Sequence, residues 1–298
     1  MSDMTTDQAF ARYEAVRPRL PTAEFPAASL HAETLADVAD RWDGFVLDAF
    51  GVLNVGDRPI PGAVDRIADL RRMGKRLCVL TNAASYPRRT ALAKYHQLGF
   101  DFSADEVVSS RDIAAAALSQ IADGAHWGAI TAEGDSFADI NARVTDLDAC
   151  DDWSGVDAIL FLSTARWTPA IYARLLGAMD ACPRPMVVAN PDLVAPREGG
   201  LSTEPGYWAH EIADRTGATL HWCGKPFPDA YLEAAARTGL APHRLAMVGD
   251  TLHTDVLGGR ASAMGTVLIT GHGLFAGRDT APFIESSGII PDAIVTTT

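Results

Sequence analysis

Gly44-Phe45-Val46-Leu47-Asp48 is a short apolar run that ends in a carboxylate, and the turn Ala49-Phe50-Gly51 follows it directly. A run of this length with a turn behind it is typical of a strand buried on both faces. Residues 63–73 then show helical periodicity, and Gly74 suits a helix C-cap. A second apolar run at 76–80 ends at Thr81-Asn82. The order of strand, helix and strand predicts a βαβ unit.

The same alternation returns near the end of the chain. The sequence predicts a helix near 229–238, a strand at 245–248 that ends at Gly249-Asp250, a helix near 255–263 and a strand at 266–269. Strands that alternate with helices favour a parallel sheet with helices on both faces. We therefore expect an α/β fold with a doubly wound parallel sheet.

The length indicates two domains, because a single hydrophobic core usually stops growing at about 250–300 residues and this chain has 298. Residues 124–220 have mixed character, with candidate strands at 158–162 and 186–189. We expect them to form an inserted, smaller α/β cap domain, while 44–123 and 221–298 form the core. Residues 1–43, which contain three prolines, are expected to be an N-terminal helical extension that packs outside the core.

Composition and charge exclude several classes of protein. A net charge of -13 without a basic cluster argues against a nucleic-acid partner. The apolar runs are too short to span a membrane, and the acidic, polar N-terminus does not resemble a secretory signal. The sequence thus favours a cytoplasmic protein. Its four cysteines lack metal-type spacing and are expected to be free thiols.

Polar residues stand where the predicted strands end. Asp48 follows the first strand, Thr81-Asn82 the second and Asp250 the later one, and Lys225 lies before the helix at 229–238. Each of these alone has a common structural role: an aspartate after a strand is often only a helix N-cap, Thr-Asn is often only a turn, and a lysine is usually a solvated surface residue. Ligands of open parallel sheets bind beyond the carboxyl ends of the strands, so their shared position and order favour a functional crevice.

These residues carry a family resemblance. Asp48-Ala49-Phe50-Gly51-Val52, Thr81-Asn82, Lys225-Pro226 and the segment 249–255 resemble the four motifs of haloacid dehalogenase (HAD) superfamily hydrolases. An insert after the second motif is similar to subfamily IIA, which includes pyridoxal, nitrophenyl, nucleotide and sugar phosphatases. Residues 188–192 are similar to the cap segment of that subfamily. The resemblance implies a Rossmann-like core and a small phosphorylated metabolite as substrate, and it leaves a homodimer open.

The resemblance also implies a mechanism. Asp48 would attack phosphorus to form an aspartyl-phosphate. Mg²⁺ would be held by Asp48, the backbone carbonyl of Phe50 and Asp250, since it prefers oxygen ligands. Asp255 would either support the metal or cap the next helix.

The remaining candidates would bind the substrate. Lys225 would neutralise negative charge, and Thr81 and Asn82 would donate hydrogen bonds to the phosphate. The cap candidates for reading the leaving group are Asn190, Asp192 and Arg166, although each also suits a turn or a surface ion pair. His253 is expected to be a loop histidine that touches solvent or the cap.

Phe50 departs from the family pattern. Many phosphatases of the superfamily have a second aspartate at this position, which protonates the leaving group and later activates water. Phenylalanine has no titratable group, so this contribution must come from elsewhere or be lost. Two alternatives therefore stay open: a 2-haloacid dehalogenase-like hydrolase, in which an aromatic residue stands at this place, and a non-catalytic phospholigand-binding protein.

Overall fold

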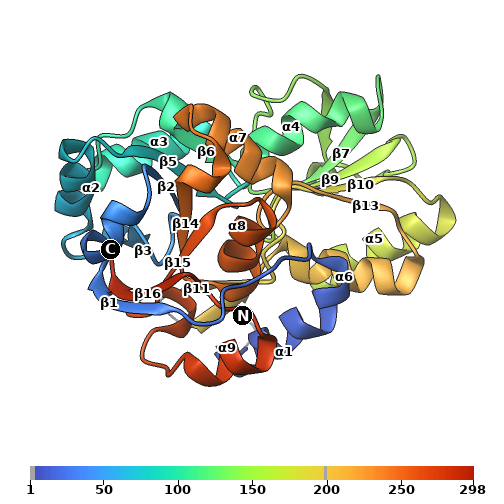
Figure 1. Ribbon diagram of the computed structural model, residues 1–298. Helices are drawn as coiled ribbons and strands as arrows, with labels where there is room; N and C mark the ends of the chain where they lie inside the picture. Colours follow the sequence, from blue (N-terminus) through green and yellow to red (C-terminus); the bar gives the residue numbers. More distant parts are fainter. Residues whose placement is uncertain (1–3, 198–199) are drawn as a thin grey trace.

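A seven-stranded sheet forms the larger half of the protein (Figure 1). The computed structural model describes residues 4–197 and 200–298. The strand order is β1-β16-β15-β14-β2-β5-β6, and every neighbouring pair is parallel. The strands are β1 (Leu30–Thr34), β2 (Gly44–Leu47), β5 (Arg76–Thr81), β6 (Val107–Ser109), β14 (Leu245–Gly249), β15 (Gly265–Ile269) and β16 (Ala293–Thr297). The prediction of a doubly wound parallel sheet is confirmed.

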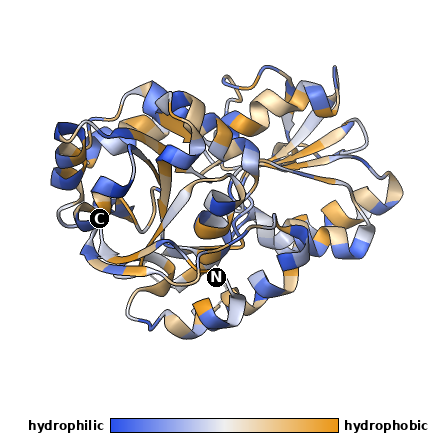
Figure 2. Cartoon of the chain, viewed as in Figure 1, coloured by the Kyte–Doolittle hydropathy of each residue, from blue (hydrophilic) through white to orange (hydrophobic). Residues whose placement is uncertain are grey.

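Helices cover both faces of this sheet because successive strand residues point to opposite sides. Phe45 and Leu47 pack with α2 (Ala63–Arg72) and α3 (Arg88–Gln97). Val46, which lies between them, packs with α7 (Pro228–Thr238) on the other face. All four residues of β2 are buried, which explains its uninterrupted apolar sequence. Figure 2 shows the apolar strands inside and hydrophilic residues on the outer faces of the helices.

A second sheet has the strand order β13-β10-β9-β7-β8, again with parallel pairs. Its strands are β7 (His126–Ile130), β8 (Arg143–Asp146), β9 (Ala158–Phe161), β10 (Met186–Val188) and β13 (Leu220–Trp222). The sheet packs against α5 (Pro169–Ala181) and α6 (Pro205–Thr216). It lies beside the large sheet in Figure 1, and β13 continues past residue 220, the expected boundary of the insert. We refer to residues 124–222 as the cap; that it is a separate folding domain stays a prediction.

Smaller elements complete the chain. They are β3 (Asn54–Val55), β4 (Arg58–Pro59), β11 (Val194–Arg197), β12 (Gly200–Thr203), α4 (Ser110–Ile121), the one-turn π-helix η6 (Leu252–Val256), α8 (Leu257–Ala261) and α9 (Ala281–Ser287). Among the helices of the described residues, none has both the length and the apolar character needed to cross a membrane.

The N-terminal segment differs from the helical extension that the sequence predicts. It begins with the helix α1 (Thr6–Val16), but residues 30–34 form the edge strand β1, which pairs with β16. Leu35 and Val38 are buried in the main core, so the segment does not pack outside it. The partner strand is more than 250 residues away in sequence, and local periodicity cannot reveal such a pairing. Residues 1–3 lie outside the described residues.

α1 joins the core to the cap. Its buried residues, among them Ala9 and Tyr13, pack with Leu252 of the core and with Leu193 of the cap. Ion pairs reach in both directions: Asp7 of α1 pairs with Arg278, and Arg12 of α1 pairs with Asp214. Arg19, in the short turn that follows α1, also pairs with Asp214 and hydrogen-bonds His210. The helix therefore bridges the two parts of the molecule, close to α6 and α9 (Figure 1).

Candidate functional site

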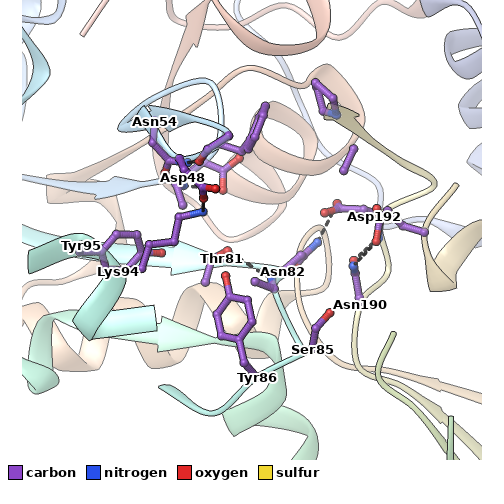
Figure 3. Close-up of a pocket in the computed structure, with 18 residues that line it drawn as sticks. Asp48, Asn54, Thr81, Asn82, Ser85, Tyr86, Lys94, Tyr95, Asn190 and Asp192 are labelled. Atoms are coloured by element: carbon purple, nitrogen blue, oxygen red, sulfur yellow. Dashed lines mark hydrogen bonds and ion pairs between the residues drawn. The ribbon is translucent and has the colours of Figure 1, made fainter. Parts of the chain in front are cut away.

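A crevice of about 430 Å³ opens where β2 and β5 end (Figure 3). Its core wall includes Asp48, Phe50, Thr81 and Asn82, which the sequence analysis placed after the ends of these strands. The cap contributes Asn190, Asp192 and Glu204 to the opposite wall. Parallel strands with a common direction bring their carboxyl ends to one edge of the sheet, which explains why residues far apart in sequence meet here.

Lys225 is buried between two carboxylates, one of which, Asp48, lines the crevice. Its Nζ is 2.7 Å from Asp48 Oδ1 and 2.7 Å from Asp255 Oδ1. The Lys225 side chain is 2% exposed, that of Asp255 is fully buried, and that of Asp48 is 13% exposed. The lysine is thus a buried cation, and of its two carboxylate partners only Asp48 remains accessible from the crevice.

Asp250 completes a cluster of three carboxylates. It follows β14, the neighbour of β2, and its Oδ2 accepts a hydrogen bond of 2.6 Å from the backbone N–H of Leu274. Oxygen atoms of Asp48, Asp250 and Asp255 all lie within 4.8 Å of one another. The sequence prediction that these three side chains meet agrees with this geometry.

The cluster has more negative charge than Lys225 can balance. Burial, together with the charges of Asp48 and Asp255, raises the pKa of Asp250 well above its usual range. Burial also raises the pKa of Asp255 to about 6, although the charge of Lys225 opposes the shift. Burial disfavours the charge on Lys225, but Asp255 and Asp48 outweigh it and raise its pKa. An additional cation with oxygen ligands, such as Mg²⁺, fits this donor set.

Two glycines leave room for the Asp250 carboxylate. Gly51 has φ +76° and Gly273 has φ +74°. A Cβ at Gly51 would lie 2.7 Å from the Asp250 carboxyl carbon, and one at Gly273 would lie 1.8 Å from its Oδ2. The turn after β2 and the loop before α9 can therefore close around Asp250 only without side chains.

Replacing Gly273 with alanine is expected to weaken cation binding. Gly277 has a similar φ of +72°, but a Cβ there meets nothing within 4 Å, so Gly277→Ala is a matched control. Both variants should lose about 1–2 kcal/mol of unfolding free energy from the left-handed backbone. Gly273→Ala should lose more and should bind Mg²⁺ more weakly, because its methyl group displaces Asp250. Urea unfolding and calorimetry measure both; equal results for the two variants would contradict the proposed contact.

Asn82 links the core to the cap. Its Nδ2 donates to Asp192 Oδ1 at 2.8 Å and to the backbone carbonyl of Lys225 at 2.9 Å, and its Oδ1 accepts from the N–H of Lys225 at 2.8 Å. The amide therefore fixes the backbone of Lys225 as well as lining the crevice. Thr81 also lines the crevice, and its Oγ1 accepts from the N–H of Ala83 at 3.2 Å.

Two of the three cap candidates face the crevice and one does not. Asn190 and Asp192 line it, whereas Arg166 is not among its lining residues. The guanidinium of Arg166 lies 2.7 Å from Asp146 and 3.0 Å from Asp148. Arg166 thus has the surface ion pair that the sequence analysis kept as its alternative.

His253 differs from its sequence expectation. Instead of touching solvent, it is buried and stacks on Tyr13 of α1 at a centroid distance of 5.0 Å. Its Nε2 lies 2.5 Å from Glu14 Oε1. Burial lowers the pKa of His253 to about 4. The sequence around His253 does not reveal this burial, because the helix that covers it lies 239 positions earlier in the chain.

Tyr13 and Asn54 are among the site residues that the sequence did not indicate. Tyr13 of α1 lies beside Asp48 and Phe50 in a small side cavity of the crevice. Asn54 is 3% exposed and lines the main crevice, and its buried Oδ1 has no hydrogen-bond partner among the described residues. This oxygen can accept a hydrogen bond from a ligand. Neither residue belongs to a motif, so no sequence signal marked them.

Comparison with known proteins agrees with this arrangement. A family model described as haloacid dehalogenase-like hydrolase matches residues 45–139, and one described as HAD-hydrolase-like matches residues 222–294. Human chronophin is 29% identical over 258 residues, which cover 80% of this chain and 84% of chronophin.

Solved structures are similar as well. One, described as a possible sugar phosphatase of the HAD superfamily from Cytophaga hutchinsonii, has a TM-score of 0.79 and 25% identity, and the match covers 90% of this chain and 98% of that one. Glycerol phosphate phosphatase from Mycobacterium tuberculosis in complex with magnesium has a TM-score of 0.65 and 27% identity, and covers 79% of this chain and 69% of its own.

Proposed function

The chain belongs to the haloacid dehalogenase-like hydrolases of subfamily IIA, and from this premise we propose that it is a magnesium-dependent phosphatase of a small phosphorylated metabolite. The similarity to phosphatases supports a hydrolase that acts on phosphate monoesters. The proposal rests on one observation, the cluster of three carboxylates beside the buried Lys225, with Asp48 of this cluster lining the crevice.

Asp48 is the nucleophile in this proposal. Its carboxylate is the accessible one of the two that contact Lys225, and it stands at the end of β2, where a phosphate in the crevice would meet it. Attack on phosphorus gives an aspartyl-phosphate, which water then hydrolyses. Lys225 holds the Asp48 carboxylate in place and neutralises charge that develops on the phosphoryl oxygens.

The metal site would use the oxygen atoms that crowd beside Lys225. Asp48, the backbone carbonyl of Phe50 and Asp250 would hold Mg²⁺, with Asp255 beside them, and the ion would supply positive charge next to the phosphate. Asp255 also accepts the N–H of Thr251 at 3.1 Å, so it orients the turn that follows Asp250.

The crevice walls limit the substrate. A volume of about 430 Å³ suits a small metabolite. Thr81 would donate its hydroxyl to a phosphate oxygen, and Asn82 acts mainly by positioning Lys225. Asn190 and Asp192 would contact the leaving group from the cap side.

Because Phe50 replaces the usual aspartate, the experiment must also distinguish a 2-haloacid dehalogenase-like hydrolase and a non-catalytic phospholigand-binding protein. A turnover screen of phosphorylated metabolites and 2-haloacids, each with and without Mg²⁺, separates them. We expect phosphate release that requires Mg²⁺. Halide release independent of the metal would instead identify a dehalogenase. Stabilisation of the fold by a phosphorylated compound without any product would identify a binding protein.

Mg²⁺ is expected to stabilise the parent protein but not Asp250→Asn. A ligand present at 100 times its Kd stabilises a fold by about 2.7 kcal/mol, and the variant lacks one of the proposed ligands. Without Mg²⁺ the variant should be at least as stable as the parent, because one crowded charge is gone. Thermal unfolding with and without MgCl₂ measures both effects, with Asp57→Asn, an exposed carboxylate at the crevice, as the control. An undiminished magnesium shift in Asp250→Asn would refute the ligand set.

A further inference from the structure

The crevice has no acid at the position where the family pattern has one. Phe50 lines the crevice beside Asp48, and a phenyl ring can neither give a proton to a leaving alkoxide nor take one from water. On the proposed function, another group must do both. Such a group must reach the oxygen that leaves phosphorus.

In-line displacement determines where that group must stand. The leaving oxygen is opposite the attacking oxygen across phosphorus, so with Asp48 on the core wall it points toward the cap. Water later attacks the aspartyl-phosphate from the same side. We propose that Asp192, on the cap segment between β10 and β11, is the catalytic acid and base. Its side chain lines both the main crevice and the side cavity, together with Asp48 and Phe50; Figure 3 shows Asp192 across the main crevice from Asp48.

Hydrogen bonds fix the position of Asp192 and leave one of its carboxyl oxygens for a substrate. Its Oδ1 accepts from Asn82 Nδ2 at 2.8 Å, and its N–H donates to Asn190 Oδ1 at 3.0 Å. No hydrogen bond to its Oδ2 occurs within the described part of the chain. The start of α6 packs tightly behind this segment, since a Cβ at Gly206 would lie 2.0 Å from the carbonyl oxygen of Pro191.

Other titratable groups in the crevice are less suited. Glu204, also on the cap, accepts from Ser202 through Oε1 at 2.7 Å and from Asn190 through Oε2 at 3.2 Å. Asp57 has a side chain that is 97% exposed, which leaves it in solvent at the mouth. Burial raises the pKa of Tyr13 well above its ordinary value, so the phenol stays protonated near neutral pH and cannot take a proton from water.

The surroundings of Asp192 suit both roles. Burial raises its pKa to about 7; the charge of Lys225 and the hydrogen bond from Asn82 oppose the shift, and the charges of Asp48 and Asp255 add to it. Tyr13 and Tyr231 also feel its charge, but both are neutral near pH 7. A carboxyl group with such a pKa is present in both protonation states near neutrality, as a group that alternates between acid and base requires.

Each step balances. First, Asp48 Oδ forms a bond to phosphorus while the bond from phosphorus to the alcohol oxygen breaks, and the Asp192 carboxyl gives its proton to that oxygen. Second, the Asp192 carboxylate takes a proton from water, the water oxygen bonds to phosphorus, and the bond to Asp48 breaks. Inorganic phosphate and alcohol leave, and both aspartates return to their starting states.

The test follows alcohol and phosphate release separately by rapid quench, with 4-nitrophenyl phosphate and ethyl phosphate as substrates. In Asp192→Asn, release of ethanol should slow by about 10²–10⁴-fold. Release of nitrophenol, a good leaving group, should change far less. The variant should therefore give a burst of one nitrophenol per site, followed by slow phosphate release. Asp57→Asn removes a carboxylate from the mouth and should match the parent.

Two further variants test the role of Asp192 by rescue and by conservative replacement. Phe50→Asp combined with Asp192→Asn places a carboxyl where the family pattern has one and should restore ethanol release. Asp192→Glu keeps the proton donor and should keep the ratio of the two ester rates, which provides a readout if Asp192→Asn does not fold.

The outcomes separate the two ideas. Equal losses for both esters in folded Asp192→Asn, or a changed ester ratio in Asp192→Glu, would overturn the role of Asp192 and leave the phosphatase function standing. Absence of turnover in the parent on both esters with Mg²⁺ would overturn the phosphatase function itself, and this inference with it.

Discussion

Asp48→Asn is expected to abolish turnover, with a loss in kcat on the order of 10⁴-fold or more, because removal of a nucleophile leaves no covalent route. The amide has almost the shape of the carboxylate, and Lys225 keeps Asp255 as a partner at 2.7 Å. The fold should therefore persist. Steady-state hydrolysis of 4-nitrophenyl phosphate with Mg²⁺, together with thermal unfolding, measures the two quantities.

The control for this variant is Asp57→Asn, which removes an exposed carboxylate from the same crevice. Acid quench of the parent during turnover should trap phosphate covalently on the protein, and Asp48→Asn should trap none. A folded Asp48→Asn protein that retains a tenth of the parent rate would show that Asp48 is not the nucleophile.

Lys225→Met is expected to damage both stability and activity. The lysine is 2% exposed between Asp48 and Asp255, and removal of one partner from a buried charge pair typically lowers the free energy of unfolding by about 3–5 kcal/mol. Loss of its charge near the phosphate should lower kcat by about 10²–10³-fold. Lys94→Met is the matched control: this lysine also lines the crevice, but it pairs with the exposed Asp57, so its loss should change stability by less than about 1 kcal/mol.

The stability defect of Lys225→Met should depend on pH. The pKa values of Asp250 and Asp255 are already raised in the folded state although Lys225 opposes the shift, so they should rise further without the lysine. Such groups contribute stability below about pH 4, and the contribution is lost as the pH rises through their folded-state values. The variant should therefore lie closest to the parent in acid and furthest below it above neutrality. Urea unfolding at pH 5 and pH 8 tests this; an equal deficit at both would contradict the charge argument.

Much of the site follows from sequence because it lies at strand ends. Asp48, Thr81 and Asp250 each follow an apolar run that could be recognised alone, and the parallel sheet then brings them to one edge. Residues with local signals are thus predictable even when the site is assembled from distant segments. The segment of Asp192 is recognised differently, through its resemblance to the cap segment of subfamily IIA.

The misses at β1, His253 and Tyr13 have a common physical cause. β1 is a strand only because β16 offers it hydrogen bonds, and His253 is buried only because α1 covers it. Tyr13 reaches the crevice for the same reason. In each case the deciding contact joins segments at opposite ends of the chain, and neither segment carries a pattern that identifies its partner. Local propensity cannot supply such information.

The bridge that α1 makes between core and cap has a consequence for substrate binding. Any widening of the crevice would separate α1 from one of its two neighbours, and where only a fraction of the molecules is open, the apparent Kd equals the intrinsic Kd divided by that fraction. Several of the contacts that must break, such as Arg12 and Arg19 with Asp214, are partly exposed ion pairs, which dissolved salt screens. Dissolved salt would therefore weaken this bridge, and so change substrate binding, through Arg12, Arg19 and Asp214, none of which lines the crevice.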